Sequence, residues 1–262
     1  MKVGFIGGGN MGGALIGGLT QKCCAPSDIA LYEKDAQKAA AFKEMGINTV
    51  ESASAAEAAS EIIVFSVKPN IIDSVLSEMS GDKNKIYLSI AAGVTVAHLE
   101  EMLGADKKIV RAMPNTPAQV GCGMTVISPN KNVDDEDIKK VKMLLSAVGM
   151  VQQMDEKFMS VATALHGSSP AYVYMFIDAM ADAGVKYGLT KKQALTLAAQ
   201  AVAGSAEMVL SCGEHPEKLK DNVCSPGGTT IAAVCDLEKN GFRGIVQSAV
   251  CACVAKADEM SK

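Results

Sequence analysis

A glycine-rich loop near the N-terminus carries the first pattern that could do chemistry. Gly7, Gly9 and Gly12 have the spacing G-x-G-x-x-G directly after an apolar run at residues 3–6, and a helical pattern begins near residue 10. In such a loop the first glycine permits a tight turn, the second lets a pyrophosphate approach the backbone, and the third lets helix and strand pack closely. The pattern predicts a dinucleotide site rather than a merely glycine-rich turn. Its members are Gly7, Gly8, Gly9, Asn10, Met11 and Gly12.

The end of the next apolar run bears on which dinucleotide would bind. Glu33 follows Gly12 by about 20 residues, where an acid binds the ribose diol and favours NAD. Lys34 is adjacent, and Lys38 follows one helical turn later. Cations at this place favour the 2′-phosphate of NADP. The residues therefore point both ways, and solvated charges at a strand end are a third interpretation.

Three loops after later apolar runs are expected at the same edge of the sheet, because ligands of open α/β sheets bind beyond the carboxyl ends of the strands. They are Ser66-Val67-Lys68-Pro69, Ile90-Ala91-Ala92-Gly93 and Met113-Pro114-Asn115-Thr116-Pro117. A fourth loop, the turn before Glu156, is expected at this edge too. The small residues Ala91 and Ala92 would let a nicotinamide ring approach the backbone. Turn chemistry alone is the alternative for each loop, and their joint placement after successive strands favours binding.

A second cluster lies far along the chain, at residues 220–230, where one expected helix ends and the next begins. Gly227 and Gly228 expose backbone N–H groups, and Ser225, Thr229 and Thr230 add hydroxyls. Amides at a helix N-terminus bind anions, so this cluster could bind a carboxylate without an arginine. An ordinary helix–turn–helix with a threonine N-cap is the alternative.

Metal and covalent chemistry have no comparable pattern. His98, His166 and His215 are scattered and lack metal-ligand spacing, so no metal is expected. His166 is the only histidine near a motif, and we expect it to be structural. The eight cysteines form no C-x-x-C pair, and we interpret them as small buried hydrophobic residues in a reducing cytoplasm.

Hydrophobic patterns indicate the elements that must position these residues. Residues 1–154 alternate β-branched apolar runs with helical patterns, which predicts an α/β domain, a dinucleotide-binding Rossmann-type doubly wound sheet. We expect Asp35 to cap a helix that ends before Gly46, and Ser54 with Glu57 to form a capping box. The strands are expected at residues 2–6, 29–32, 48–50, 62–66, 85–90, 108–113, 124–128 and 150–153.

Residues 155–262 carry no strand pattern and are expected to form an all-α domain for substrate binding and dimerisation. Thr190 with Gln193 marks one helix start, and Gly188 and Gly241 mark helix ends. The helix after Thr190 is apolar or small on almost every side, so it must be buried in a large core or a subunit interface. The helices are expected at residues 156–165, 171–187, 191–211, 216–222, 231–240 and 244–260.

Composition excludes several classes of protein. The net charge is −4 and only two residues are arginine, so no nucleic-acid partner is expected. A hydrophobic share of 48% argues against disorder. The first 18 residues include eight glycines, unlike a signal peptide, and the uncharged run 158–177 is broken by Gly167 and Pro170, unlike a membrane span. We therefore expect a soluble cytoplasmic protein without a membrane partner.

Several segments together resemble the bacterial type of pyrroline-5-carboxylate reductase, over essentially the full length of the chain. They are residues 3–12, 67–69, 111–117, 167–172 and 220–230, of which the last is the most specific. The resemblance implies NAD(P)H-dependent reduction of L-1-pyrroline-5-carboxylate to L-proline, the last step of proline biosynthesis. It also implies an oxidoreductase that transfers hydride to an imine carbon, and a homodimer that assembles into a larger homo-oligomer such as a decamer.

The resemblance assigns roles to individual residues. The substrate carboxylate would lie on Ser225, Gly227, Gly228 and Thr229, with the Thr230 hydroxyl, the catalytic group, facing the imine nitrogen. Asn222 and the loops 66–69 and 90–92 match cofactor-contacting positions. The cofactor is expected to be NADPH, with NADH as the other candidate, because relatives often carry Asn-Arg or Ser/Thr where this chain has Glu33-Lys34.

Two other functions are compatible with parts of the sequence. A β-hydroxyacid dehydrogenase or an imine reductase would also join a Rossmann domain to a helical one. Such dehydrogenases place a catalytic lysine one turn into the helix after a glycine-rich segment, and here no lysine follows Gly167 before Lys186. A catalytically silent nucleotide-sensing protein is the alternative from another class, and the intact loop 225–230 argues against it.

Overall fold

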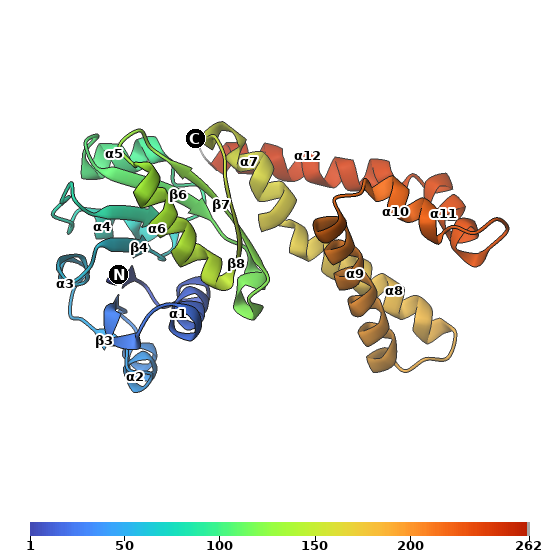
Figure 1. Cartoon of the computed structure of the whole chain (residues 1–262), viewed down its shortest axis with the longest axis horizontal. Helices are drawn as coiled ribbons and strands as arrows, with labels where there is room; N and C mark the ends of the chain where they lie inside the picture. The colour runs from blue at the N-terminus through green and yellow to red at the C-terminus, as the bar shows by residue number, and fades with distance from the viewer. Residues whose placement is uncertain (261–262) are drawn as a thin grey trace. The chain divides into compact units, whose positions relative to one another are not determined.

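The computed structural model describes residues 1–260, and the first half of the chain is built on one eight-stranded sheet (Figure 1). The strand order is β3-β2-β1-β4-β5-β6-β7-β8. The strands are β1 Val3–Ile6, β2 Ile29–Tyr32, β3 Asn48–Thr49, β4 Ile62–Phe65, β5 Ile86–Ser89, β6 Lys108–Met113, β7 Gly123–Pro129 and β8 Gly149–Gln153. All eight lie where the sequence predicts them, and the predicted fold class is confirmed.

Helices cover both faces of this sheet, as alternate residues of β4 show. Ile62 and Val64 belong to one buried apolar cluster with α1 and α6, whereas Ile63 and Phe65 belong to a second cluster with α3, α4 and α5. A strand buried on both faces needs apolar residues at every position, which explains its continuous hydrophobic run. The helices of this half are α1 Asn10–Lys22, α2 Ala36–Glu44, α3 Ala53–Ala58, α4 Ile72–Leu76, α5 Val96–Leu103 and α6 Asp135–Leu145, with short 3₁₀ turns η1 Pro26–Asp28, η2 Pro69–Ile71, η3 Thr116–Val120 and η4 Ser146–Val148.

One strand pair departs from an all-parallel sheet. β7 runs antiparallel to β6, and β8 is parallel to β7, so these two strands run opposite to the other six. The connection between β6 and β7 contains only the short turn η3, whereas a parallel connection needs a dozen or more residues. The carboxyl ends of β1, β2, β4, β5 and β6 still meet at one edge, as a dinucleotide site requires.

Two helix starts in this half were predicted from capping residues. Asp35 caps α2 through hydrogen bonds that its carboxylate accepts from the Gln37 and Lys38 amides, as predicted. The predicted capping box of Ser54 with Glu57 is wrong, because Ser52 caps α3 instead. Glu57 is buried, and its carboxylate accepts hydrogen bonds from the Tyr87 hydroxyl at 2.6 Å and the Ser80 amide at 2.8 Å.

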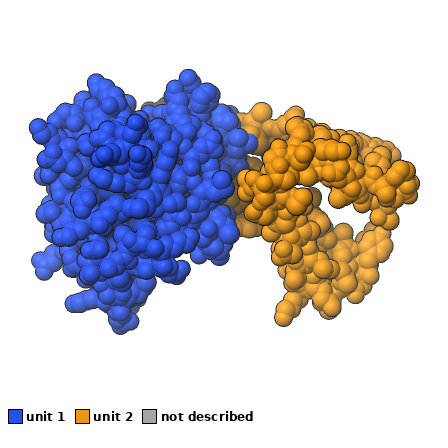
Figure 2. All heavy atoms as spheres, viewed as in Figure 1, with its two compact units in different colours: residues 1–168, 254–262 blue, residues 169–253 orange. Residues whose placement is uncertain are grey.

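The chain forms two compact units (Figure 2), one of residues 1–168 with the C-terminal residues from 254, the other of residues 169–253. The sequence predicts a domain boundary after residue 154 instead. Residues 155–168 belong to the first unit because Met159 and Ala162 join Val126 of the sheet in a small apolar cluster, and Glu156 pairs with Arg111. The helix predicted over 156–165 is divided into η5 Glu156–Phe158, α7 Met159–Ala162 and a π-helix, η6 Thr163–Gly167.

The second unit is helical, and residues 155–260 contain no strand. Thr190 caps α9 in the predicted capping box with Gln193, and Gly188 and Gly241 have positive φ where helices end. α9 is long and apolar enough to cross a membrane. One such helix is weak evidence for a membrane span, because a helix in a subunit interface has the same composition. The helices are α8 Ser169–Lys186, α9 Lys191–Cys212, α10 Pro216–Val223, α11 Thr229–Lys239 and α12 Phe242–Met260, whose last turns belong to the first unit.

Candidate functional site

The glycine loop after β1 has the geometry that its sequence predicts. Gly7 has φ +99°, and a Cβ there would lie 2.9 Å from the Ser66 carbonyl oxygen. A Cβ on Gly12 would lie 2.6 Å from the Gly7 carbonyl oxygen, so only glycine lets α1 approach the loop this closely. A Cβ on Gly9 would meet no atom within 4 Å. The loop is therefore tight at its first and third glycines and open at its second, which fits a pyrophosphate against Gly9.

A cavity of about 290 Å³ lies beside this loop, at the carboxyl ends of β1, β2 and β4. Seven residues predicted to bind the cofactor line it: Gly7, Gly9, Glu33, Lys34, Ser66, Val67 and Lys68. Ser66 fixes the shape of the loop, because its hydroxyl donates to the Gly7 carbonyl oxygen at 2.6 Å. Sequence segments about 60 residues apart thus meet at one edge of the sheet, as ligand sites of open sheets do.

Five further residues line the cavity, and the sequence analysis assigns none of them to the cofactor site. Lys38 adds a positive charge, and Ile6, Tyr32, Ile71 and Val75 form an apolar wall. Ile71 lies two residues after the predicted loop 66–69 and is 40% exposed. Its place in the wall depends on how η2 and α4 pack, which the sequence pattern does not indicate.

The other predicted cofactor loops lie elsewhere in the first unit. Ala92 and Gly93, which follow β5, line a small cavity of about 60 Å³ with Arg111, Met113 and Thr163. Asn115 is buried, and its amide donates to the His166 carbonyl oxygen and accepts from the Met124 amide, both at 2.9 Å. Its side chain therefore holds the loop after β6 in place. Some predicted cofactor residues are only sequence neighbours of the lining residues and line neither the 290 Å³ nor the 60 Å³ cavity. They are Gly8, Asn10, Met11, Pro69, Ile90 and Ala91.

The predicted carboxylate-binding cluster forms the loop between α10 and α11 in the second unit. Gly227 has φ +67°, and the Gly228 amide donates to the Ser225 carbonyl oxygen at 3.0 Å, which closes a tight turn. Gly228 is the N-cap of α11 and makes no side-chain cap, so a threonine N-cap is not what this loop contains. Thr229 and Thr230 are the first two helical residues, and both are exposed. Their amides and hydroxyls are therefore available to an anion.

Asn222 lies on α10 in the second unit. It lines an apolar groove of about 400 Å³ within the second unit, together with Met208, Val209 and Leu219. His215 is the N-cap of α10, and its Nδ1 accepts a hydrogen bond from the Glu217 amide. The cofactor contact of Asn222 stays a prediction.

Comparisons with known proteins agree with both halves of this arrangement. Residues 156–260 match the family described as pyrroline-5-carboxylate reductase dimerisation, and residues 2–93 match the family described as NADP oxidoreductase, coenzyme F420-dependent. The pyrroline-5-carboxylate reductase of Escherichia coli is 49% identical over 100% of this chain and 98% of its own length. The chain belongs to the pyrroline-5-carboxylate reductase family.

Further relatives of this family span kingdoms and include solved structures. The pyrroline-5-carboxylate reductase of Pisum sativum is 40% identical over 99% of this chain and 96% of its own. The Coxiella burnetii enzyme has a TM-score of 0.95 at 35% identity and covers 100% of this chain and 98% of its own. The Plasmodium falciparum enzyme, solved with NADP bound, has a TM-score of 0.89 at 38% identity with the same coverage. The predicted family and enzyme class are confirmed.

Family membership makes the chain a soluble oxidoreductase that acts on a small molecule and has a dimerisation domain.

The first unit carries one further group of chemical interest for such an enzyme, the imidazole of His166 in η6. Both of its ring nitrogens are buried and form no hydrogen bond. Burial lowers the pKa of His166, because desolvation penalises the charged form.

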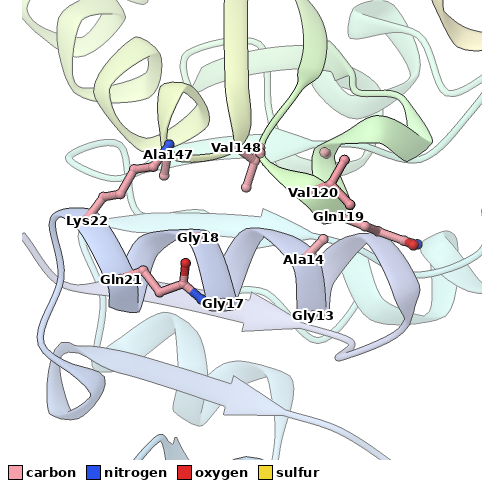
Figure 3. Close-up of a pocket in the computed structure, with 12 residues that line it drawn as sticks. Gly13, Ala14, Gly17, Gly18, Gln21, Lys22, Gln119, Val120, Ala147 and Val148 are labelled. Carbon is pink, nitrogen blue, oxygen red and sulfur yellow. The ribbon is translucent and has the colours of Figure 1, made fainter. Parts of the chain in front are cut away.

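A second cavity of the first unit, of about 560 Å³, shares no lining residue with the dinucleotide cavity. Figure 3 shows the residues that line it. It runs along α1, whose small residues Gly13, Ala14, Gly17 and Gly18 face the η3 and η4 turns. Gly18 is needed there, because a Cβ would clash with the Val148 side chain. Gly18 thus allows α1 to pack closely on η4, and we assign it a structural role.

Proposed function

We propose that this chain reduces L-1-pyrroline-5-carboxylate to L-proline with NADPH, the last step of proline biosynthesis. The observation that carries the proposal is the α10–α11 loop, which exposes Thr229 and Thr230, with their amides and hydroxyls, at the start of an 11-residue helix. A helix N-terminus with its hydroxyls suits the single carboxylate of this substrate. The open position at Gly9 and the cavity beside it suit a dinucleotide.

The residues of this chain have distinct tasks in the proposed reaction. The cofactor, when bound, would supply a hydride to the imine carbon, and the ring nitrogen would take up one proton from solvent. Ser225, Gly227, Gly228 and Thr229 hold the carboxylate, and the Thr230 hydroxyl donates a hydrogen bond to the imine nitrogen. A protonated imine is the better electrophile, so a neutral donor beside the nitrogen is enough and no strong acid is required. Positioning of the two reactants supplies most of the rate enhancement.

The experiment that tests this proposal follows NADPH absorbance. Purified chain and NADPH are mixed with L-1-pyrroline-5-carboxylate, and we expect the absorbance to fall as proline accumulates. A parallel reaction contains a 2-methyl-3-hydroxy acid and oxidised cofactor, the substrates of a β-hydroxyacid dehydrogenase. Loss of NADPH with the imine alone supports the proposal. A stable absorbance with the imine contradicts it, whatever the second reaction shows.

We also propose the setting in which this reaction occurs. The second unit forms a homodimer, and dimers assemble into a larger homo-oligomer, for which the decamer is our specific proposal. The support is the exposed apolar surface of α8 and α9, including Leu197 and Leu210. A cytoplasmic location without membrane or nucleic-acid partners fits a net charge of −4 and eight free cysteines. Light scattering of the purified chain measures the assembly directly.

A further inference from the structure

The dinucleotide cavity contains one carboxylate whose position is fixed by the backbone. Glu33, directly after β2, accepts a hydrogen bond from the Gly8 amide at 2.6 Å and another from the Asp35 amide at 2.9 Å. The first bond joins the end of β2 to the glycine loop, and the second joins it to the N-cap of α2. Glu33 therefore has little freedom to swing out of the cavity that it lines.

No cation neutralises this carboxylate within residues 1–260, where Glu33 forms no ion pair. Three lysines line the same cavity: Lys34, Lys38 and Lys68. The Lys38 ammonium lies 3.9 Å from an oxygen of Asp35, the residue that caps α2. The cavity thus holds a carboxylate fixed by the backbone beside three lysines.

A fixed carboxylate at the end of β2 distinguishes the two nicotinamide cofactors. Each carboxylate oxygen has two lone pairs, so Glu33 can accept a ribose hydroxyl while it keeps its bonds to the two amides. The 2′-phosphate of NADPH carries a charge of about −1.5 to −2, which Glu33 repels and the lysines attract. The same residue therefore favours NADH and disfavours NADPH.

We infer that Glu33 determines cofactor selectivity: it binds the adenosine ribose of NADH, makes NADH a working cofactor beside NADPH, and weakens the binding of NADPH. Lys34 and Lys38 act in the opposite direction by attracting the 2′-phosphate. The inference rests on the dinucleotide site of the proposed function and does not depend on the substrate.

The test measures binding without substrate, by titrating full-length protein with NADH and with NADPH and following nicotinamide fluorescence. Wild type is expected to bind both cofactors. Glu33→Gln keeps the length and an acceptor oxygen but removes the charge, so the ratio of the NADPH Kd to the NADH Kd should fall about tenfold. The double variant Lys34→Ala/Lys38→Ala should raise that ratio by about tenfold. Glu44→Gln, on the exposed end of α2, makes the same charge change away from the cavity and should leave the ratio unchanged.

The inference is overturned if wild type does not bind NADH, or if Glu33→Gln changes the Kd ratio by less than about threefold. If Glu33→Gln is unstable, the lysine double variant decides: an unchanged ratio overturns the inference, and a raised ratio supports it. Binding and turnover separate this inference from the proposed function. If the variants shift the Kd ratio but the wild type does not reduce the imine, the inference is supported and the proposed function is contradicted. If the wild type reduces the imine but the variants leave the Kd ratio unchanged, the proposed function is supported and the inference is overturned.

Discussion

The two compact units differ in how much apolar surface a single chain covers. In the first, the residues of β1, β4 and β5 are all buried. In the second, only Ala181, Ala194 and Ala198 of residues 169–253 are buried, while Leu197 is 63% and Leu210 is 64% exposed. A patch of apolar side chains this extensive is typical of an interface. The residues that line the dinucleotide cavity all belong to the first unit, whereas the carboxylate loop belongs to the unit with the exposed apolar surface.

The sharpest way to break this comparison is to place a charge on α9. Leu197→Glu should raise the dissociation constant of the dimer by roughly a thousandfold, because a carboxylate buried in an apolar interface pays a large desolvation penalty. Turnover should be lost with the dimer, whereas the NADPH Kd should not change. Light scattering, turnover and cofactor titration measure the three quantities.

The matched control for this variant is Met143→Glu on α6, which changes a half-exposed methionine of the first unit in the same way. It should remain dimeric and active. A dimeric, fully active Leu197→Glu protein would show that this face of α9 is not the interface.

The next largest effect is expected at the carboxylate loop. Thr230→Ala should lower kcat by roughly tenfold or more, the scale of one catalytic hydrogen bond, with cofactor affinity near normal. Thr230→Ser keeps the hydroxyl and should restore most of the rate. Steady-state kinetics with both substrates separates kcat from KM. Equal turnover of wild type and Thr230→Ala would remove the hydroxyl from the mechanism.

A smaller effect is expected in the first unit, at the open position of the glycine loop. Gly9→Ala should weaken NADPH binding by about fivefold, because the added methyl group occupies the space into which a pyrophosphate fits. Its thermal stability should not fall, since the methyl group meets no protein atom within 4 Å. Gly17→Ala on α1 is the matched control, because its Cβ is equally unhindered but lies outside the dinucleotide cavity. Equal NADPH affinities of the two variants would contradict a pyrophosphate at Gly9.

In the first unit, the sequence predicts the features that burial or steric fit requires, and it does not predict strand direction or the choice between similar caps. The strands of the sheet were predicted because burial on both faces requires continuous apolar runs, and the G-x-G-x-x-G loop because each glycine has a steric task. The direction of β7 was missed, since hydrophobicity carries no strand direction. The Ser54 cap is wrong because Ser52, two residues earlier, offers the same hydroxyl, and it is Ser52 that accepts the hydrogen bond from the Ala55 amide.

The candidate site was predictable to an unequal extent. Residues of the dinucleotide cavity follow successive parallel strands, so topology alone brings Glu33 and Ser66 to one edge. Ile71 and Val75 were missed because a wall of the cavity depends on how η2 and α4 pack. In the second unit, helical periodicity located the loop before α11 but not what covers α8 and α9, because that depends on a second chain.

The smallest expected effect concerns His166 and the stability of the first unit. Burial lowers the pKa of His166 in the folded chain below the unfolded value of about 6.5. As the pH falls, His166 is therefore protonated in the unfolded chain before it is protonated in the folded chain. The free energy of unfolding should therefore be unaffected by His166 above that pH and should decline as the pH falls below it. His166→Gln removes the titrating group, so its melting temperature should fall less than that of wild type between neutral and mildly acidic pH. His98→Gln leaves His166 in place and should keep the wild-type decline. If the melting temperatures of wild type and His166→Gln fall equally with pH, the protonated imidazole must have a hydrogen-bond acceptor or contact with water, and its nitrogens are not buried without a partner.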